Sequence, residues 1–177
     1  MPYLESFAED ANQGEVFKRW PEVSRHLVAL AQQLLCDGPL PRALAELIFT
    51  YVSHLNNCEY AFEIHRHAAG MLGADAQLLD AIVKDINDAS IDDRTRTLLL
   101  FVKKLTGSPS AVTRADANDV LNAGWNEDEF HYAVSICAFT NYMNRSLSGH
   151  GIVGDSEHWK KSGQAIAELE YSKFIPR

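Results

Sequence analysis

Glu46, Cys58 and His65 lie within one short stretch of the chain and carry three chemically different side chains. A carboxylate, a thiol and an imidazole are the groups that enzymes use most often to transfer protons or to attack electrophiles. If a helix begins near residue 58, Cys58 and His65 lie on one face of it, two turns apart. The spacing therefore predicts a site in which these three residues act together.

The expected helix start would give Cys58 its reactivity. Backbone N–H groups in the first turn of a helix lack partners, and the helix dipole is positive there, so a thiolate is favoured over a thiol. His65 would exchange a proton with a bound ligand, and Glu46 on the preceding helix would orient the imidazole or act as a base. Ordinary core packing is the alternative for Cys58 and His65. It explains Glu46 less well, because a carboxylate in an apolar run is costly to bury without a partner.

The spacing of these residues resembles the signature of alkylhydroperoxidase D-like (AhpD-like) proteins in the carboxymuconolactone decarboxylase family. That signature reads Glu, eleven residues, Cys-x-x-Cys, three residues and His, and Glu46, Cys58 and His65 match it. The segments 52–60, 96–106 and 139–145 look like the peroxidase-related branch of the family. The resemblance extends over residues 40–150, which is most of the chain.

The resemblance implies an all-α, AhpD-like fold, assembly into dimers, trimers or hexamers, and reduction of peroxides by a dithiol. Glu46 and His65 would assist proton transfer, and Cys58 would keep the place of the first cysteine. Ala61 stands where the family has its second, peroxide-attacking cysteine, so no disulfide can form within the motif. Cys58 would then react alone, through a sulfenic acid resolved by an external thiol reductant, or would pair with one of the two other cysteines.

Three functions follow as hypotheses. The first is a peroxidase-related thiol oxidoreductase with peroxiredoxin-like activity on small hydroperoxides, with Cys58 as its only motif thiol. The second is a cysteine-independent acid–base enzyme of the carboxymuconolactone decarboxylase type, in which Glu46 and His65 act on a small carboxylated substrate. The third is a non-catalytic family member that has lost the site together with the second thiol. We expect neither a cofactor nor a metal, because Asn56-Asn57 separates His54 from the other candidate ligands.

Helical periodicity predicts the elements that position these residues. Apolar side chains recur three and four residues apart over most of the chain, with breaks at Asn, Gly and Pro residues. We expect one domain over residues 1–177, with N-terminal helices in 1–40, a motif-bearing core in 40–150 and a tail in 151–177. The glycines of the tail leave room for only a short helix there. The expected helices cover residues 21–35, 41–55, 58–72, 75–86, 92–105, 113–123 and 126–147.

A faint internal repeat accompanies this helical pattern. Arg42-Ala43-Leu44 matches Arg96-Thr97-Leu98, and Ala69-Gly70 matches Ala123-Gly124 at the same offset. Val112 takes the place of Cys58 in the second copy. If the repeat is real, the fold unit is structural and the chemistry is confined to the first copy.

Composition excludes several classes of partner. The chain has 24 acidic and 16 basic residues and a net charge of −8, without the basic cluster that nucleic acid or an acidic membrane surface requires. No apolar run approaches the ~20 residues of a membrane span, and no secretory signal or disulfide framework is visible. We expect a cytoplasmic homo-oligomer that binds a small-molecule substrate and, for the first hypothesis, an external thiol reductant.

Overall fold

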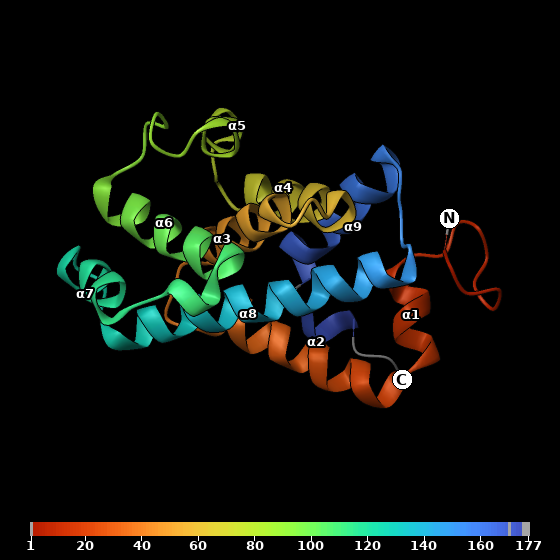
Figure 1. Ribbon diagram of the computed structural model, residues 1–177. Coiled ribbons are helices and arrows are strands. Elements are labelled where there is room, and N and C mark those ends of the chain that lie inside the picture. Colours follow the sequence, from red (N-terminus) through yellow and green to blue (C-terminus); the bar gives the residue numbers. More distant parts are fainter. Residues whose placement is uncertain (1, 170, 175–177) are drawn as a thin grey trace.

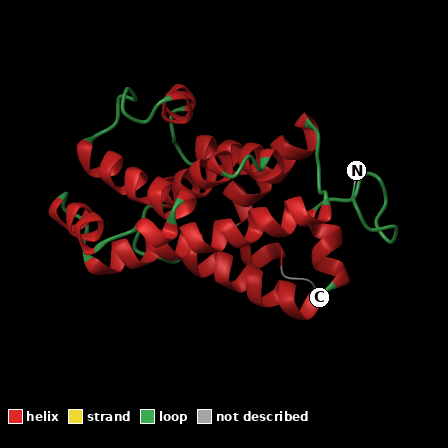
Figure 2. Ribbon diagram, viewed as in Figure 1, coloured by secondary structure: helices red, strands yellow, loops and turns green. Residues whose placement is uncertain are grey.

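The computed structural model describes residues 2–169 and 171–174. Every regular element in these residues is helical (Figure 2), which confirms the predicted all-α class. None of the described helices is both long and apolar enough to cross a membrane. Two short 3-10 turns, η1 (Pro109–Ala111) and η2 (Tyr171–Phe174), accompany the α-helices, which are α1 (Gln13–Arg19), α2 (Pro21–Leu35), α3 (Arg42–Leu55), α4 (Glu59–Met71), α5 (Ala76–Lys84), α6 (Asp93–Gly107), α7 (Arg114–Asn122), α8 (Glu127–His150) and α9 (Ser156–Leu169).

The longest helix, α8, runs through the middle of the molecule, with α2 on one side and α3 and α6 on the other (Figure 1). It begins with a capping box in which Asn126 and Glu129 satisfy each other's backbone N–H groups. It ends at Gly151, whose φ of 68° is the left-handed conformation that glycine adopts at little cost. Its buried residues recur three or four positions apart and form one apolar stripe: Ala133, Ile136, Cys137, Phe139, Thr140, Met143, Asn144 and Leu147.

Helices α3 and α4 form an antiparallel hairpin that carries the motif. The predicted break is present, because α3 ends at Leu55 with Asn56 as its C-cap, and Asn57 adopts a φ of 53°. Asn tolerates this left-handed conformation better than most residues. Cys58 follows as the N-cap of α4. The tight turn brings the inner faces of the two helices together, so that Glu46 on α3 lies opposite His65 on α4.

The tail differs from the prediction, because α9 is a helix of 14 residues rather than a short one. It packs along α4, where Gly163 allows the two backbones to approach closely. A Cβ atom at Gly163 would lie 2.6 Å from the carbonyl oxygen of Ile64 and 3.1 Å from the backbone nitrogen of Ala68. Gly163 therefore does not end the helix; it makes the helix contact possible.

Replacing Gly163 with alanine should lower the free energy of unfolding by about 1–3 kcal/mol, because the added methyl group has no room against the backbone of α4. Gly70 in α4 is the matched control, since nothing lies within 4 Å of the position of its Cβ. Gly70→Ala should be neutral or stabilise by up to about 1 kcal/mol. Urea denaturation of both variants measures the difference, and a Gly163→Ala protein as stable as the parent would refute this packing.

The second copy of the proposed repeat also forms a pair of helices. Helices α6 and α7 occupy the positions that the offset assigns to α3 and α4, with η1 between them. Val112, the counterpart of Cys58, lies just before the Thr113 N-cap of α7. Helix α7 is shorter than α4 and has only Val120 as a buried residue.

Candidate functional site

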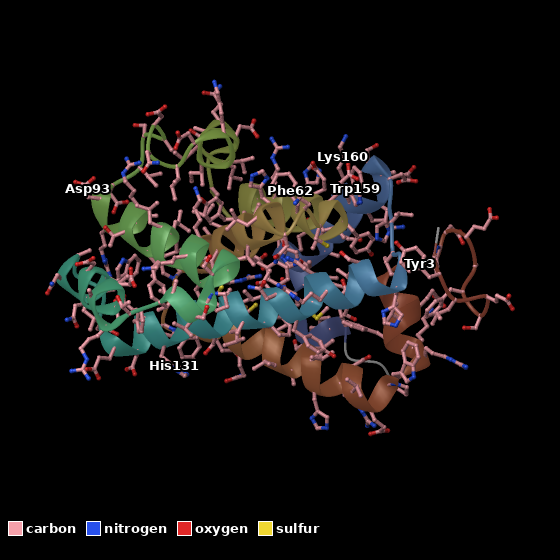
Figure 3. All side chains as sticks on the ribbon, in the orientation of Figure 1. Tyr3, Phe62, Asp93, His131, Trp159 and Lys160 are labelled. Carbon is pink, nitrogen blue, oxygen red and sulfur yellow. The ribbon has the colours of Figure 1, made fainter. Side chains whose placement is uncertain are left out.

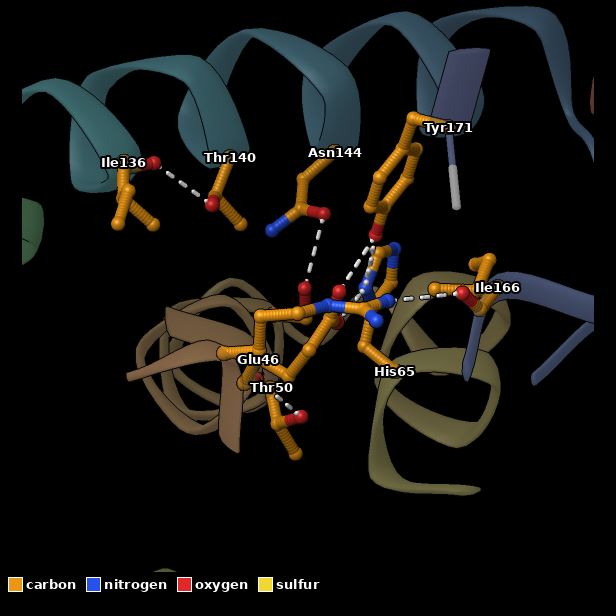
Figure 4. A network of polar contacts seen from close by, with 10 residues as sticks. Glu46, Thr50, His65, Ile136, Thr140, Asn144, Ile166 and Tyr171 are labelled. Carbon is orange, nitrogen blue, oxygen red and sulfur yellow. Dashed lines mark hydrogen bonds and ion pairs between the residues drawn. The ribbon is translucent and has the colours of Figure 1, made fainter. Parts of the chain in front are cut away.

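A buried cluster of three side chains joins α3, α4 and the end of the described chain (Figure 4). Glu46 Oε2 lies 2.6 Å from His65 Nδ1. The Tyr171 hydroxyl donates a hydrogen bond of 2.8 Å to Glu46 Oε1, and its oxygen lies 3.3 Å from His65 Nδ1. Glu46 is fully buried and His65 is 7% exposed. Each oxygen of the carboxylate therefore has a donor, which offsets the cost of burying it.

The hydrogen bonds of the cluster define the chemistry available to His65. Because a carboxylate only accepts hydrogen bonds, the contact with Glu46 favours the tautomer of His65 that carries its proton on Nδ1. Nε2 is the ring nitrogen that Glu46 does not contact. Phe49 stacks on the imidazole with ring centroids 3.6 Å apart and an angle of 15° between the rings, which holds the ring plane in place. The contact with Glu46 and the stacking on Phe49 together fix the orientation of the His65 ring.

Tyr171 remains a hydrogen-bond donor over the physiological pH range. Burial raises the pKa of its hydroxyl well above the usual value, and the nearby negative charge of Glu46 raises it further. The sequence did not indicate this residue, because it lies in a polar tail far from the motif. Its hydroxyl is the second hydrogen-bond donor to the Glu46 carboxylate and comes from η2.

His65 and Tyr171 line a cavity of about 510 Å³. Its volume suits a small molecule, and its walls are largely apolar, as is usual for ligand-binding cavities. Helices α1, α2, α4, α8 and α9 all contribute to it, together with Phe49 of α3. The apolar wall consists of Phe17, Leu27, Val28, Ala31, Phe49, Ile64, Phe139, Met143, Ala165, Ile166 and Phe174.

A second polar group, formed by Tyr60, His158 and Ser162, lines the same cavity. The Tyr60 oxygen accepts a hydrogen bond of 3.1 Å from the backbone N–H of Gln13 and lies 2.8 Å from His158 Nε2. Ser162 Oγ is 3.3 Å from the same nitrogen. Burial raises the pKa of Tyr60 to about 12, so its hydroxyl stays protonated and can donate a hydrogen bond.

The charge of the cavity lining is opposite in sign to that of the protein. Lys18 and Lys161 line it, and no Asp or Glu is among its lining residues in the described part of the chain. The chain as a whole carries a net charge of −8. Lys18 is already paired with Glu15 at 2.7 Å. A cavity of this sign, with low-dielectric walls, favours an anionic ligand.

Cys58 does not take part in this arrangement. Its residue is 5% exposed, its side chain makes no capping hydrogen bond to α4, and it is not among the described residues that line the cavity. Two helical turns, ~10 Å along the axis, separate it from His65. The position one turn before His65 belongs to Ala61, which carries only a methyl group. The fold thus brings Glu46 and His65 together but leaves Cys58 outside the group.

The other cysteines lie elsewhere, and no disulfide joins any of the three. Cys137 is fully buried on α8, where burial raises the pKa of its thiol and Thr106 Oγ1 lies 3.3 Å from its sulfur. Cys137 is therefore part of the hydrophobic core. Cys36 is half-buried at the end of α2. Within the described residues, no three His, Cys, Asp or Glu side chains are grouped so that they could hold a metal ion.

Comparisons with known proteins agree on the family and the fold. The model of the carboxymuconolactone decarboxylase family matches residues 21–104. An uncharacterized peroxidase-related protein from Silicibacter sp. TM1040 is 25% identical, with a TM-score of 0.73 over 80% of this chain and 74% of the other. None of the curated proteins matches significantly.

Two further solved structures share the fold at lower identity. An uncharacterized peroxidase-related protein from Ralstonia eutropha JMP134, described as an alkylhydroperoxidase AhpD core, is 23% identical, with a TM-score of 0.75 over 84% of this chain and 78% of the other. A protein of unknown function from Agrobacterium tumefaciens is 18% identical, with a TM-score of 0.69 over 79% and 95%. Residues 21–104 therefore resemble the carboxymuconolactone decarboxylase family, and the chain has an AhpD-like fold.

Proposed function

We propose that the protein is an acid–base enzyme in which His65, rather than Cys58, acts on a small anionic substrate in the cavity. The observation that carries this proposal is the pairing of His65 with the fully buried Glu46 at the wall of the cavity. A general base needs a fixed tautomer and an available nitrogen, and this pairing supplies both. Cys58 lies outside the cavity lining, so the proposed reaction does not involve its sulfur.

The proposed step is a proton transfer at a carbon atom next to a carbonyl or carboxylate group. His65 Nε2 takes the proton, and the electron pair of the broken C–H bond moves onto the carbonyl oxygen to give an enolate. Glu46 stabilises the imidazolium that forms, as a carboxylate does when it is hydrogen-bonded to the other ring nitrogen. Return of the proton from His65 to carbon completes the cycle and leaves no change in oxidation state.

The proposed substrate carries a carboxylate. Lys161 and the Tyr60–His158–Ser162 group provide cationic and hydrogen-bonding side chains on the wall of the cavity, and no carboxylate among the described lining residues opposes them. The family is named for a decarboxylase of a carboxylated lactone, which supports the same class of substrate. The apolar wall would hold the carbon skeleton against His65.

Lys161→Gln should weaken the binding of benzoate by roughly fivefold, because an ion pair close to solvent contributes at most about 1 kcal/mol. Benzoate and benzamide have nearly the same shape and differ in charge, so the unmodified protein should prefer benzoate. The variant should lose that preference. Titration calorimetry or ligand-observed NMR at low ionic strength measures both affinities.

The neighbouring lysine is the control for this experiment. Lys160 is exposed on the same helix but does not line the cavity (Figure 3). Lys160→Gln removes the same charge from the chain and should leave the preference for benzoate intact. Equal effects of the two substitutions would mean that only net charge matters, and the assignment of Lys161 would be wrong.

A thiol peroxidase is the second candidate, and the position of Cys58 favours it. Cys58 is the N-cap of α4, so its side chain lies at the positive end of the helix dipole. Its sulfur would attack a hydroperoxide, releasing the alcohol and forming a sulfenic acid. Two equivalents of an external thiol would then restore Cys58 and yield a disulfide and water. This candidate requires that Cys58→Ser abolish peroxide consumption with a thiol reductant, and unchanged consumption eliminates it.

A further inference from the structure

The last described segment of the chain, η2, is attached to the body of the protein beside the proposed base. It packs against α2, where the backbone N–H of Ser172 donates a hydrogen bond of 2.9 Å to the side chain of Gln32. Tyr171 is 9% exposed, and its hydroxyl points inward to Glu46 and His65 (Figure 4). The tail thus supplies a polar atom to a pair of residues that the α3–α4 hairpin forms.

We propose that Tyr171 is a positioning residue for His65, and that its hydroxyl sets how tightly the Glu46–His65 pair holds a proton. The consequence for turnover rests on the proposed function, but the effect on the pair does not. The hydroxyl donates to one carboxylate oxygen, and His65 donates to the other. A hydrogen bond to the charged form of an acid favours that form. Tyr171 therefore makes the Glu46 carboxylate less basic toward the proton it shares with His65.

The hydroxyl, rather than the aromatic ring, carries this role. The Tyr171 ring lies nearly parallel to the imidazole, but the ring centroids are 6.4 Å apart, which is too far for close stacking. Phe49 already provides the stacked face at 3.6 Å. Phenylalanine at position 171 would keep the packing of the ring and remove only the donor.

Other ionisable groups surround the pair and are unchanged by that substitution. The charges of two of them act on Tyr171 itself: Arg42 on α3 lowers the pKa of its hydroxyl, and Cys36 at the end of α2 raises it. The remaining ones lie on the wall of the cavity that His65 also lines: Lys18, Tyr60, His158 and Lys161. A change seen in the Phe variant therefore reports on the lost hydroxyl.

The test is a titration of the His65 ring protons by NMR in the full chain. In Tyr171→Phe the midpoint should move to higher pH by about one unit, which corresponds to a tenfold tighter hold on the proton. The matched control is Tyr60→Phe, which removes the other buried tyrosine hydroxyl of the cavity, one that bonds to His158 instead. Tyr60→Phe should leave the His65 midpoint in place. An unchanged midpoint in Tyr171→Phe would overturn the proposal.

A second variant should shift the His65 midpoint in the opposite direction, which distinguishes an effect of the hydroxyl from an effect on folding. Replacement of Tyr171 with 3-fluorotyrosine keeps the ring and strengthens the donor, so the His65 midpoint should move to lower pH. If 3-fluorotyrosine moved the His65 midpoint in the same direction as Tyr171→Phe, the proposal would be overturned. Altered packing, rather than the strength of the hydroxyl donor, would then explain both shifts. The acid limb of the kcat/KM profile should follow the NMR midpoint. If the midpoint moves but turnover does not depend on His65, the role of Tyr171 stands and the proposed function fails.

Discussion

Replacing His65 with glutamine should reduce turnover by two to four orders of magnitude, which is the usual contribution of a general base. Glutamine keeps a polar side chain of similar length but cannot take up a proton. The reaction to follow is the exchange of C–H protons for deuterium in small 2-oxo and 3-oxo carboxylates dissolved in D₂O. One-dimensional proton NMR measures this exchange without knowledge of the physiological substrate.

Two controls make this result specific to His65. Cys58→Ser should leave the exchange rate within about twofold, because the sulfur is not part of the cavity lining. His131→Gln removes an exposed imidazole of α8 and should have no effect. Loss of exchange in the Cys58 variant together with loss of thiol-dependent peroxide consumption would favour the peroxidase candidate instead.

Glu46→Ala should lower the free energy of unfolding by about 3–5 kcal/mol, one of the largest effects available in this chain. The substitution leaves the buried donors of His65 and Tyr171 without their acceptor and opens a cavity between α3 and α4. Chemical denaturation monitored by circular dichroism measures the change. The loss should be larger than for any exposed carboxylate.

Glu59 provides the comparison, because it is exposed in the first turn of α4. Glu59→Ala should change stability by no more than about 0.5 kcal/mol. The loss of unfolding free energy in Glu46→Gln should lie between those of Glu46→Ala and Glu59→Ala. The amide oxygen of glutamine can replace only part of the acceptor capacity of the carboxylate. If Glu46→Ala proved as stable as Glu59→Ala, the carboxylate would not hold the cluster together.

The sequence predicted the Glu46–His65 pair because both residues lie in one local hairpin. Their approach depends on two adjacent helices and on the turn at Asn56-Asn57, and the polarity pattern indicates all of these. Glu46 was informative because burial of a carboxylate requires a partner, and the hairpin brings His65 opposite it. Local contacts of this kind are the ones that residue spacing can predict.

The contribution of the tail could not be predicted in the same way. Tyr171 reaches Glu46 across 125 residues of sequence, and no periodic pattern encodes a contact at that separation. The glycines of the tail suggested only a short helix, whereas Gly163 allows α9 to pack closely on α4. A glycine that breaks a helix and one that admits a neighbouring backbone look identical in sequence.

The place of Cys58 shows a similar limit. The predicted helix start is correct, since Cys58 is the N-cap of α4. Which side of α4 faces the cavity depends on α1, α9 and η2, and these elements lie far from the motif in sequence. The residues that line the cavity therefore include His65 and Tyr60 of α4 but, in the described part of the chain, neither Cys58 nor Ala61.

The most direct test of the central claim is the ¹⁵N spectrum of the His65 imidazole at alkaline pH, with and without saturating benzoate. We expect that Nδ1 carries the proton, that Nε2 is unprotonated, and that benzoate shifts the Nε2 resonance. A proton on Nε2, or an Nε2 resonance that does not respond to benzoate, would contradict it, because His65 could then not act as a base on a ligand in this cavity.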